Sequence, residues 1–189
     1  ECVQTITVQD TTAPSITLCP ASATVECTAD TTPAALGTAT ATDNCDATPA
    51  ITFTDASTQT STGACTDQNY TITRTWRATD NCRNFSECVQ TITVRDSTPP
   101  VVSTAVGSLD RTVECSDTEG LAAALALVPS ATDNCTASPT LNPVSDVKTP
   151  DANCLNAYVQ VRTWNFTDGC DNTSADFVQT ITVRDTTPP

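Results

Sequence analysis

One stretch of sequence occurs three times along the chain, and this repetition constrains the fold more than any other feature. Residues 1–14 read ECVQTITVQDTTAP, residues 87–100 read ECVQTITVRDSTPP and residues 176–189 read DFVQTITVRDTTPP. Shorter strings, including TVEC, ATDNC and RTW, recur in the same order between these copies. Self-similarity at a fixed period is typical of a chain built from tandem copies of one small domain.

The repeat sets the expected domain boundaries. One copy covers residues 14–99 and the next covers residues 100–189, whereas residues 1–13 correspond to the last strand and linker of a preceding copy. About 90 residues per copy is enough for one small sandwich domain. The chain begins and ends at the same phase of the repeat and shows no initiator Met or signal peptide, so we expect it to be a segment of a longer array.

The pattern within each copy predicts an all-β fold. Thr, Val and Ile alternate in short runs that Pro, Asp and Asn clusters separate, as in β-strands joined by turns. The predicted strands of the first copy are residues 37–42, 51–54, 70–76 and 89–94. Residues 119–127, EGLAAALAL, predict a short helix, whereas the matching TTPAALGTA of the first copy predicts at most a turn. The spacing indicates tandem immunoglobulin-like β-sandwich domains joined by short Pro-rich linkers.

Composition places the chain outside the cell and argues against catalysis. Eleven cysteines without a single His, and without a Cys-x-x-Cys pair, indicate disulfides formed in an oxidising compartment rather than a zinc site. A net charge of −14 argues against binding to nucleic acid or to anionic membranes. Without His there is no Ser-His or Cys-His pair, and there is no phosphate-binding loop, so we expect no enzyme activity.

Three motifs together resemble those of the hyalin repeat (HYR-like) domain. They are P-x-I-x-x-C-P from Pro14, W-x-A-T-D-x-C-x-N from Trp76, and C-x-x-T-I-T-V-x-D-x-T-P-P from Cys88. The closest similarity is to the Cys-rich version that occurs in tandem in large bacterial surface proteins. This resemblance implies an immunoglobulin-like fold and a role in extracellular adhesion or assembly, and it brings no catalytic residues. The second copy departs from the pattern because Phe177 replaces the last cysteine.

Comparison of the two copies suggests how the cysteines pair. Cys19 and Cys88 have no counterparts in the second copy, and their joint loss predicts a bond between them. The loops of such a sandwich suggest two more bonds per copy, one at each end of the domain. An alternative is sequential pairing, Cys27–Cys45 and Cys65–Cys82. Cys2 corresponds to Cys88, so its partner is expected in a preceding copy. The predicted bonds are Cys19–Cys88, Cys45–Cys82, Cys27–Cys65, Cys135–Cys170 and Cys115–Cys154.

Acidic turns supply the candidate metal ligands. An Asp-Asn pair on one loop, an Asp on the neighbouring loop and an Asp in the incoming linker are expected to meet at one end of each domain. Carboxylate and amide oxygens are the ligands that calcium prefers, whereas the alternative is that Asp-Asn only stabilises turns. The predicted ligands are Asp10, Asp43, Asp80 and Asn84 at one joint, Asp96, Asp133, Asp168 and Asn172 at the next, and Asp185 in the third linker.

An Arg lies two residues before each Trp, at Arg74 and Trp76 and at Arg162 and Trp164. Both members of a pair lie on the same face of a strand, so the Arg could stack on the Trp ring. The alternative is a core Trp beside an Arg that reaches solvent.

These features leave two functional hypotheses. The first is a structural extracellular protein whose tandem repeats form a stiff fibre, filament or stalk, with calcium at the joints and neighbouring repeats as partners. The second is a cell-surface adhesin that binds glycan or protein. Repetition of near-identical joints favours the fibre, and neither hypothesis involves nucleic acid or insertion into a membrane.

Overall fold

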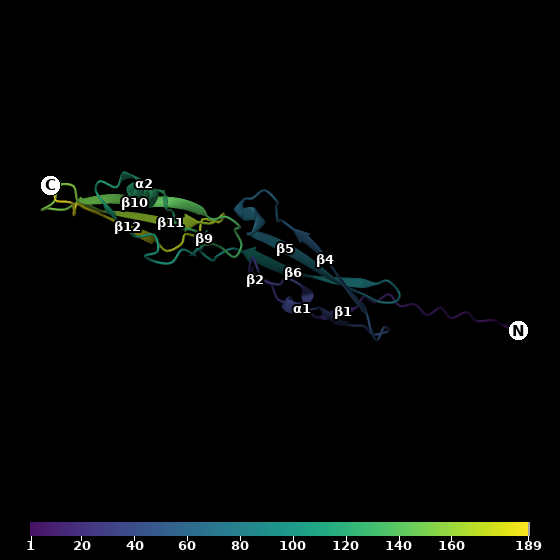
Figure 1. Ribbon diagram of the computed structural model, residues 1–189. Coiled ribbons are helices and arrows are strands. Elements are labelled where there is room, and N and C mark those ends of the chain that lie inside the picture. The colour runs from purple at the N-terminus through teal and green to yellow at the C-terminus, as the bar shows by residue number, and fades with distance from the viewer. Residues whose placement is uncertain (189) are drawn as a thin grey trace. The chain divides into compact units, whose positions relative to one another are not determined.

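The computed structural model describes residues 1–188; Pro189, the last residue of the second predicted copy, lies outside the described residues. The chain divides into two compact units, Glu1–Asp96 and Ser97–Pro189 (Figure 1). The predicted boundary lay between Pro99 and Pro100. Each unit is built mainly of β-strands, so the expected all-β class is confirmed.

The first unit contains a four-stranded sheet and a two-stranded sheet. The four-stranded sheet has the order β2-β6-β5-β4, in which β5 and β6 form a long antiparallel hairpin and β2 runs parallel to β6. The other sheet pairs β1 with β3. A four-residue helix, α1, and a 3-10 turn, η1, complete the unit. The bounds are β1 Ser15–Leu18, β2 Ala23–Glu26, α1 Pro33–Leu36, β3 Thr40–Thr42, β4 Ala50–Ser57, η1 Cys65–Asp67, β5 Tyr70–Thr79 and β6 Phe85–Arg95.

The second unit has the same strand arrangement. Its four-stranded sheet has the order β8-β12-β11-β10, with β8 parallel to β12, and its two-stranded sheet pairs β7 with β9. A nine-residue helix, α2, takes the place of α1. The bounds are β7 Val101–Val102, β8 Arg111–Glu114, α2 Thr118–Ala126, β9 Ala131–Thr132, β10 Thr140–Pro150, β11 Tyr158–Thr167 and β12 Phe177–Arg184.

The predicted strands and the predicted helix agree in position with observed elements, but two other segments differ from their predictions. The four predicted runs overlap β3, β4, β5 and β6, and the predicted helix overlaps α2. The segment TTPAALGTA forms a short helix rather than only a turn. Residues 1–13 were expected to be a strand, but residues 1–14 form none. A strand is stable only beside partner strands, and the partners of this segment would belong to a preceding copy.

Alternate residues of the long strands build the core. In β6, Gln90, Ile92 and Val94 are buried while the residues between them are more exposed, and β12 repeats this with Gln179, Ile181 and Val183. In β5 the buried face includes Arg74 and Trp76. Arg74 does not reach solvent: its Cζ lies 4.8 Å from the Phe53 ring centroid and 6.0 Å from that of Trp76, and it forms a bidentate pair with Asp55 at 2.8 Å.

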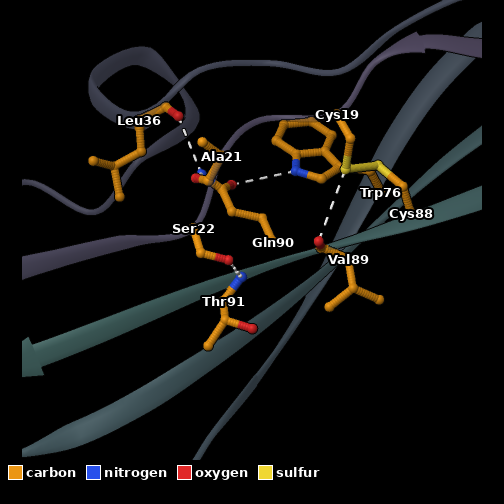
Figure 2. Close-up of a disulfide and its surroundings, with 9 residues drawn as sticks. All are labelled: Cys19, Ala21, Ser22, Leu36, Trp76, Cys88, Val89, Gln90 and Thr91. Atoms are coloured by element: carbon orange, nitrogen blue, oxygen red, sulfur yellow. Dashed lines mark hydrogen bonds between the residues drawn. A yellow bond between two sulfur atoms is a disulfide. The ribbon is translucent and has the colours of Figure 1, made fainter.

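A polar network crosses the core beside a disulfide. Gln90 is fully buried, and its amide group donates to the carbonyl oxygens of Ala21 (3.0 Å) and Leu36 (3.1 Å). Its oxygen accepts from the Trp76 indole N–H at 3.3 Å. Figure 2 shows this network next to the Cys19–Cys88 bond. A single Gln side chain therefore connects the start of β2, the end of α1 and the central strand.

Candidate functional site at the ends of the units

Each unit has two ends that the strand register defines. In the first unit, the turn between β5 and β6 and the loop after β3 lie at one end, which we call the entry end. The end of β6, the end of β2 and the start of β5 lie at the other, the exit end, because Arg95 pairs with Glu26 and Val94 with Tyr70. The second unit has the same two ends, since Arg184 pairs with Glu114 and Val183 with Tyr158.

Three predicted ligands meet at the entry end of the first unit. Asp10 comes from the incoming linker, Asp43 from the loop after β3 and Asp80 from the turn after β5. One carboxylate oxygen of each lies within 4.8 Å of the others. The fold thus brings together three acids that are far apart in the sequence.

Asp43 uses one oxygen to form its turn and leaves the other without a partner. Its Oδ1 accepts from the backbone N–H groups of Cys45 (3.0 Å) and Asp46 (2.9 Å). The hydrogen bonds from Asp46 and Cys45 lower the pKa of the Asp43 carboxyl group. Its Oδ2 is buried and has no hydrogen-bond partner in the structure. The turn therefore uses only one of the two carboxylate oxygens of Asp43.

Asn84 holds Asp80 and the linker in place. Its backbone N–H donates to Asp80 Oδ1 (2.8 Å) and its side-chain Nδ2 donates to Asp80 Oδ2 (2.7 Å). The same Nδ2 contacts the carbonyl oxygen of Asp10 at 3.2 Å. These contacts turn the amide nitrogen of Asn84 toward the acidic group, and ligation of a metal by Asn84 stays a prediction.

The donor set of this group fits a hard divalent cation. All three side chains offer carboxylate oxygen, and Asp80 is only 6% exposed. On β5, Arg77 pairs with Glu87 at 2.7 Å, whereas Arg83 lies in the same turn as Asp80. Two unit charges 4 Å apart repel by about 1 kcal/mol in water and about 4 kcal/mol at the effective dielectric constant of a protein surface. Calcium, which binds six to eight oxygens, would relieve this repulsion.

The second unit repeats the turn geometry. Asp133 Oδ1 accepts from the N–H groups of Cys135 (2.9 Å) and Thr136 (2.7 Å), and its Oδ2 is buried without a hydrogen-bond partner. Asp168 Oδ2 accepts from Asn172 Nδ2 at 2.7 Å, the counterpart of the Asp80–Asn84 contact. Carboxylate oxygens of Asp133 and Asp168 lie within 4.8 Å of each other. The second unit thus has the same loop acids as the first.

The two linker acids that follow the last strands lie at exit ends. Asp96 directly follows β6 in the first unit, where it is buried and its backbone N–H donates to Asn69 Oδ1 (2.6 Å). Asp185 follows β12, is exposed, and accepts from Asn156 Nδ2 at 3.2 Å. A carboxylate oxygen of Asp185 lies within 4.8 Å of Glu114 and of the Cys115 sulfur.

Sequence reasoning missed the residue that ties the two entry-end loops together. Asp46 is 8% exposed, and its Oδ2 accepts from the backbone N–H of Asn81 at 3.1 Å. In the second unit Thr136 has this role, since its Oγ1 accepts from the N–H of Gly169 at 3.2 Å. The signal was weak because the residue after the cysteine changes type between the copies.

Cys19 and Cys88 form a disulfide with Cα atoms 6.2 Å apart, the pair that their joint loss predicts. Cys88 pairs in register with Trp76. At the equivalent register position of the second unit, Phe177 faces Trp164, and their ring centroids lie 6.5 Å apart. The second unit therefore fills with an aromatic ring the place that the bridge occupies in the first.

The remaining cysteines differ from the predicted pairing. Cys27, Cys65, Cys135 and Cys170 are disulfide-bonded. Cys45, Cys82, Cys115 and Cys154 are free thiols, as is Cys2. The predicted Cys45–Cys82 and Cys115–Cys154 bonds do not form, and the sequential alternative fails as well because it needs Cys45 and Cys82. Pairing of Cys27 with Cys65 and of Cys135 with Cys170 stays a prediction.

Two of these free thiols lie in turns that an Asp closes. Cys45 lies in the turn that Asp43 closes, and the side-chain amide of Asn44, at 3.2 Å, contacts its sulfur. Cys154 lies in a turn closed by Asp151, whose Oδ1 accepts from the Cys154 N–H at 3.1 Å. Partial desolvation and the charge of Asp10 raise the pKa of Cys45, and desolvation and the charge of Asp185 raise the pKa of Cys115. Both pairs of free thiols are therefore near carboxylates.

Comparison with known proteins found one family that is similar to the second unit. Residues 103–183 match the family of HYR-like domains with four cysteines. This range contains Cys115, Cys135, Cys154 and Cys170. No curated protein matches the chain. Among residues 1–188, no helix has the length and apolar character that crossing a membrane requires. Residues 103–183 are therefore similar to HYR-like domains with four cysteines, and this match confirms the resemblance that the sequence motifs indicated.

Proposed function

We propose that this chain is part of a structural extracellular array, in which tandem domains bind calcium at their entry ends and form a stiff fibre or stalk. The observation that carries the proposal is the convergence of Asp10, Asp43 and Asp80 within 4.8 Å, with a buried Asp43 oxygen that has no hydrogen-bond partner. The HYR-like domain and the disulfides support an extracellular location. The protein has no role as an enzyme in this proposal.

The role of calcium follows from where the three acids come from. Asp43 and Asp80 belong to loops of the folded unit, whereas Asp10 belongs to the linker that precedes it. Without a cation, repulsion drives the linker away from the loops. With calcium bound, the linker is held against the entry end, and the direction in which the chain enters the domain is fixed. Because the loop acids recur as Asp133 and Asp168, the same control would act at every joint.

Calcium titration by calorimetry tests the site itself. Extracellular calcium modules bind with dissociation constants of about 10⁻⁴ to 10⁻³ M. Asp43→Asn should weaken binding by at least about tenfold, which is about 1.4 kcal/mol, because Asn keeps the turn acceptor and removes the charge. Asp30→Asn is the matched control, since Asp30 Oδ1 accepts a turn hydrogen bond from the Thr32 N–H (2.8 Å) outside this group. Equal calcium affinity in the two variants would assign the entry-end acids to turn formation alone.

Small-angle scattering tests the mechanical consequence. We expect the maximum dimension and the rigidity of the native chain to be larger with calcium than with a chelator at matched ionic strength, while each disulfide-containing domain stays folded. Asp133→Ala should reproduce the effect of the chelator at one joint. An identical scattering curve in calcium and in chelator would contradict the stiff-fibre proposal, even if calcium binds.

A further inference from the structure

The first unit carries a groove on the outer face of its four-stranded sheet. Side chains alternate between the two faces along a strand, so Thr75 and Arg77 of β5 lie on the face opposite the buried Trp76. The register places Thr54 of β4 beside Thr75. It also places Glu87 of β6 beside Arg77, so the outer face runs across three strands. The groove on this face is lined by Thr52, Phe53, Thr54, Thr75, Arg77 and Glu87.

Arg77, Glu87 and Phe85 form one connected group at this groove. Arg77 Nε donates to Glu87 Oε1 at 2.7 Å, and the Arg77 Cζ lies 4.0 Å from the centroid of the Phe85 ring. The hydrogen bond uses Nε, and neither Nη group of Arg77 donates to another side chain among residues 1–188. A guanidinium group that is held in position by a carboxylate and a ring therefore keeps donors for a ligand.

The apolar part of this surface is exposed. Phe85 is 49% exposed, and Val89, two residues further along β6 and on the same face, is exposed as well. The side chains of Arg77 and Glu87 are also exposed. An aromatic ring thus lies beside hydrogen-bonding groups and Thr hydroxyls on one sheet face. Such a surface can bind an apolar patch and several hydroxyl groups of the same ligand.

The second unit has a different set of residues at this place. Asn165 corresponds to Arg77, because each directly follows the Trp of its strand. Asn165 Nδ2 contacts Asp176 Oδ1 at 3.4 Å. Residues 173–176, which precede β12, contain no aromatic residue. The group of Arg77 with its ring and carboxylate is therefore a feature of the first unit and not a requirement of the shared strand arrangement.

We propose that this groove binds a neutral oligosaccharide of hexopyranose units. One face of a pyranose ring is apolar because its C–H bonds point there, whereas its hydroxyl groups lie around the rim. Phe85 offers a ring on which the C–H face stacks, and Arg77 and Glu87 offer donors and acceptors for the rim. The Thr hydroxyls of the groove both donate and accept.

Charge and size favour this ligand over an acidic glycan or a protein. Arg77 and Glu87 neutralise each other within the groove, whereas the whole chain has a net charge of −14. An acidic glycan would be repelled by the chain and would meet a guanidinium that is already paired. A protein partner usually covers about 800 Å² on each side, which is far more than a groove lined by six residues offers.

This inference goes beyond the proposed function, because it gives the array a surface that adheres to polysaccharide. The groove uses none of the three entry-end acids, so it does not depend on the calcium site. Asp43→Asn should bind the oligosaccharide as the native chain does, and Phe85→Ala should bind calcium as the native chain does. Failure of the groove is therefore distinguishable from failure of the proposed function.

Binding is tested by applying the full chain to an array of immobilised tetrasaccharides. We expect signal on at least one of the neutral series, built from glucose, galactose or mannose, and none on glucuronate or galacturonate tetrasaccharides. Phe85→Ala should lower the signal at least about fivefold, because aromatic anchors carry much of the energy of a binding site. Phe85→Trp keeps a ring and should keep the signal. Val178→Ala is the matched control, since Val178 is an exposed apolar residue of β12 in the second unit.

Nuclear magnetic resonance on the labelled full chain locates the site. The neutral tetrasaccharide with the strongest array signal should shift the amide signals of Thr54, Thr75 and Glu87 and leave those of β11 unchanged. The proposal is overturned by absence of signal on every neutral series, by preference for the acidic series, or by equal signals from the native chain and Phe85→Ala. Shifts confined to the second unit would overturn it as well.

Discussion

At the scale of single residues, the Gln of the repeated VQTITV string is the most informative position. Gln90 and Gln179 are both fully buried, and each donates its amide group to two backbone carbonyl oxygens. Gln90 accepts from the Trp76 indole, whereas Gln179 accepts from Arg162 Nη1 at 3.0 Å. In each unit one buried side chain therefore satisfies two backbone carbonyl oxygens.

Replacing Gln90 by Leu should therefore destabilise the first unit strongly. The change leaves two carbonyl oxygens and an indole N–H without partners, and each buried unsatisfied group costs about 1–3 kcal/mol. We expect the free energy of unfolding to fall by at least about 2 kcal/mol, as measured by urea denaturation. Gln4→Leu is the matched control because Gln4 occupies the same place in the first copy of the motif but is exposed. An equal effect of the two substitutions would contradict this role.

The sequence predicted the acids of the entry end but not this Gln. An Asp that begins a turn has a recognisable setting, because Asp43 and Asp80 each follow a strand and precede a cysteine. A Gln inside a strand is ordinarily expected to be exposed. Gln90 is buried with its hydrogen bonds made to the carbonyl oxygens of Ala21 and Leu36, which are distant from it in the sequence. The predicted bond between Cys45 and Cys82 is also absent, since both cysteines are free thiols.

At the scale of elements, the same insertion point carries helices of different length. The helix α2 extends over nine residues, and the carboxylate of its N-cap, Asp117, accepts from the Gly120 N–H at 2.8 Å. The helix α1 has four residues, and the side chain of its N-cap residue, Thr32, makes no capping hydrogen bond. Alternation of β-branched residues made the strands predictable. By contrast, residues 1–14 repeat a strand sequence without its partner strands and stay irregular.

Asp117→Ala should destabilise α2 by about 1 kcal/mol, because replacing an Asp cap by Ala leaves a helix N–H group without its acceptor. The measurement is hydrogen exchange in the first turn of α2, which should speed up several-fold. Thr118→Ala is the matched control, since Thr118 is the exposed first residue of the same helix. Unchanged protection in Asp117→Ala would mean that packing of α2 on its unit, through residues such as Ala124 and Leu121, sets its stability alone.

At the scale of the whole molecule, covalent links compensate for thin cores. The buried hydrophobic residues of each unit are few. Trp76 is the large ring of the first unit, and Trp164, Phe166 and Phe177 are the large rings of the second. A domain of this size gains little from its core alone and usually needs disulfides or metal. The disulfide stabilises the small core of the first unit, and the Trp164–Phe177 contact stabilises that of the second.

Loss of the Cys19–Cys88 bridge should lower the stability of the first unit and not that of the second. The Cys19–Cys88 bond closes a loop with a sequence separation of 69 residues. In the chain-entropy treatment such a bond contributes about 4 kcal/mol. Cys19→Ser/Cys88→Ser should lower the unfolding free energy of the first unit by roughly this amount and leave the second unit unchanged. Hydrogen exchange followed by mass spectrometry on the full chain resolves the two, because peptides from β6 and β12 report on each unit separately. If β12 lost protection together with β6, the units would unfold as one cooperative body, and the bridge would stabilise the whole chain instead of its own domain.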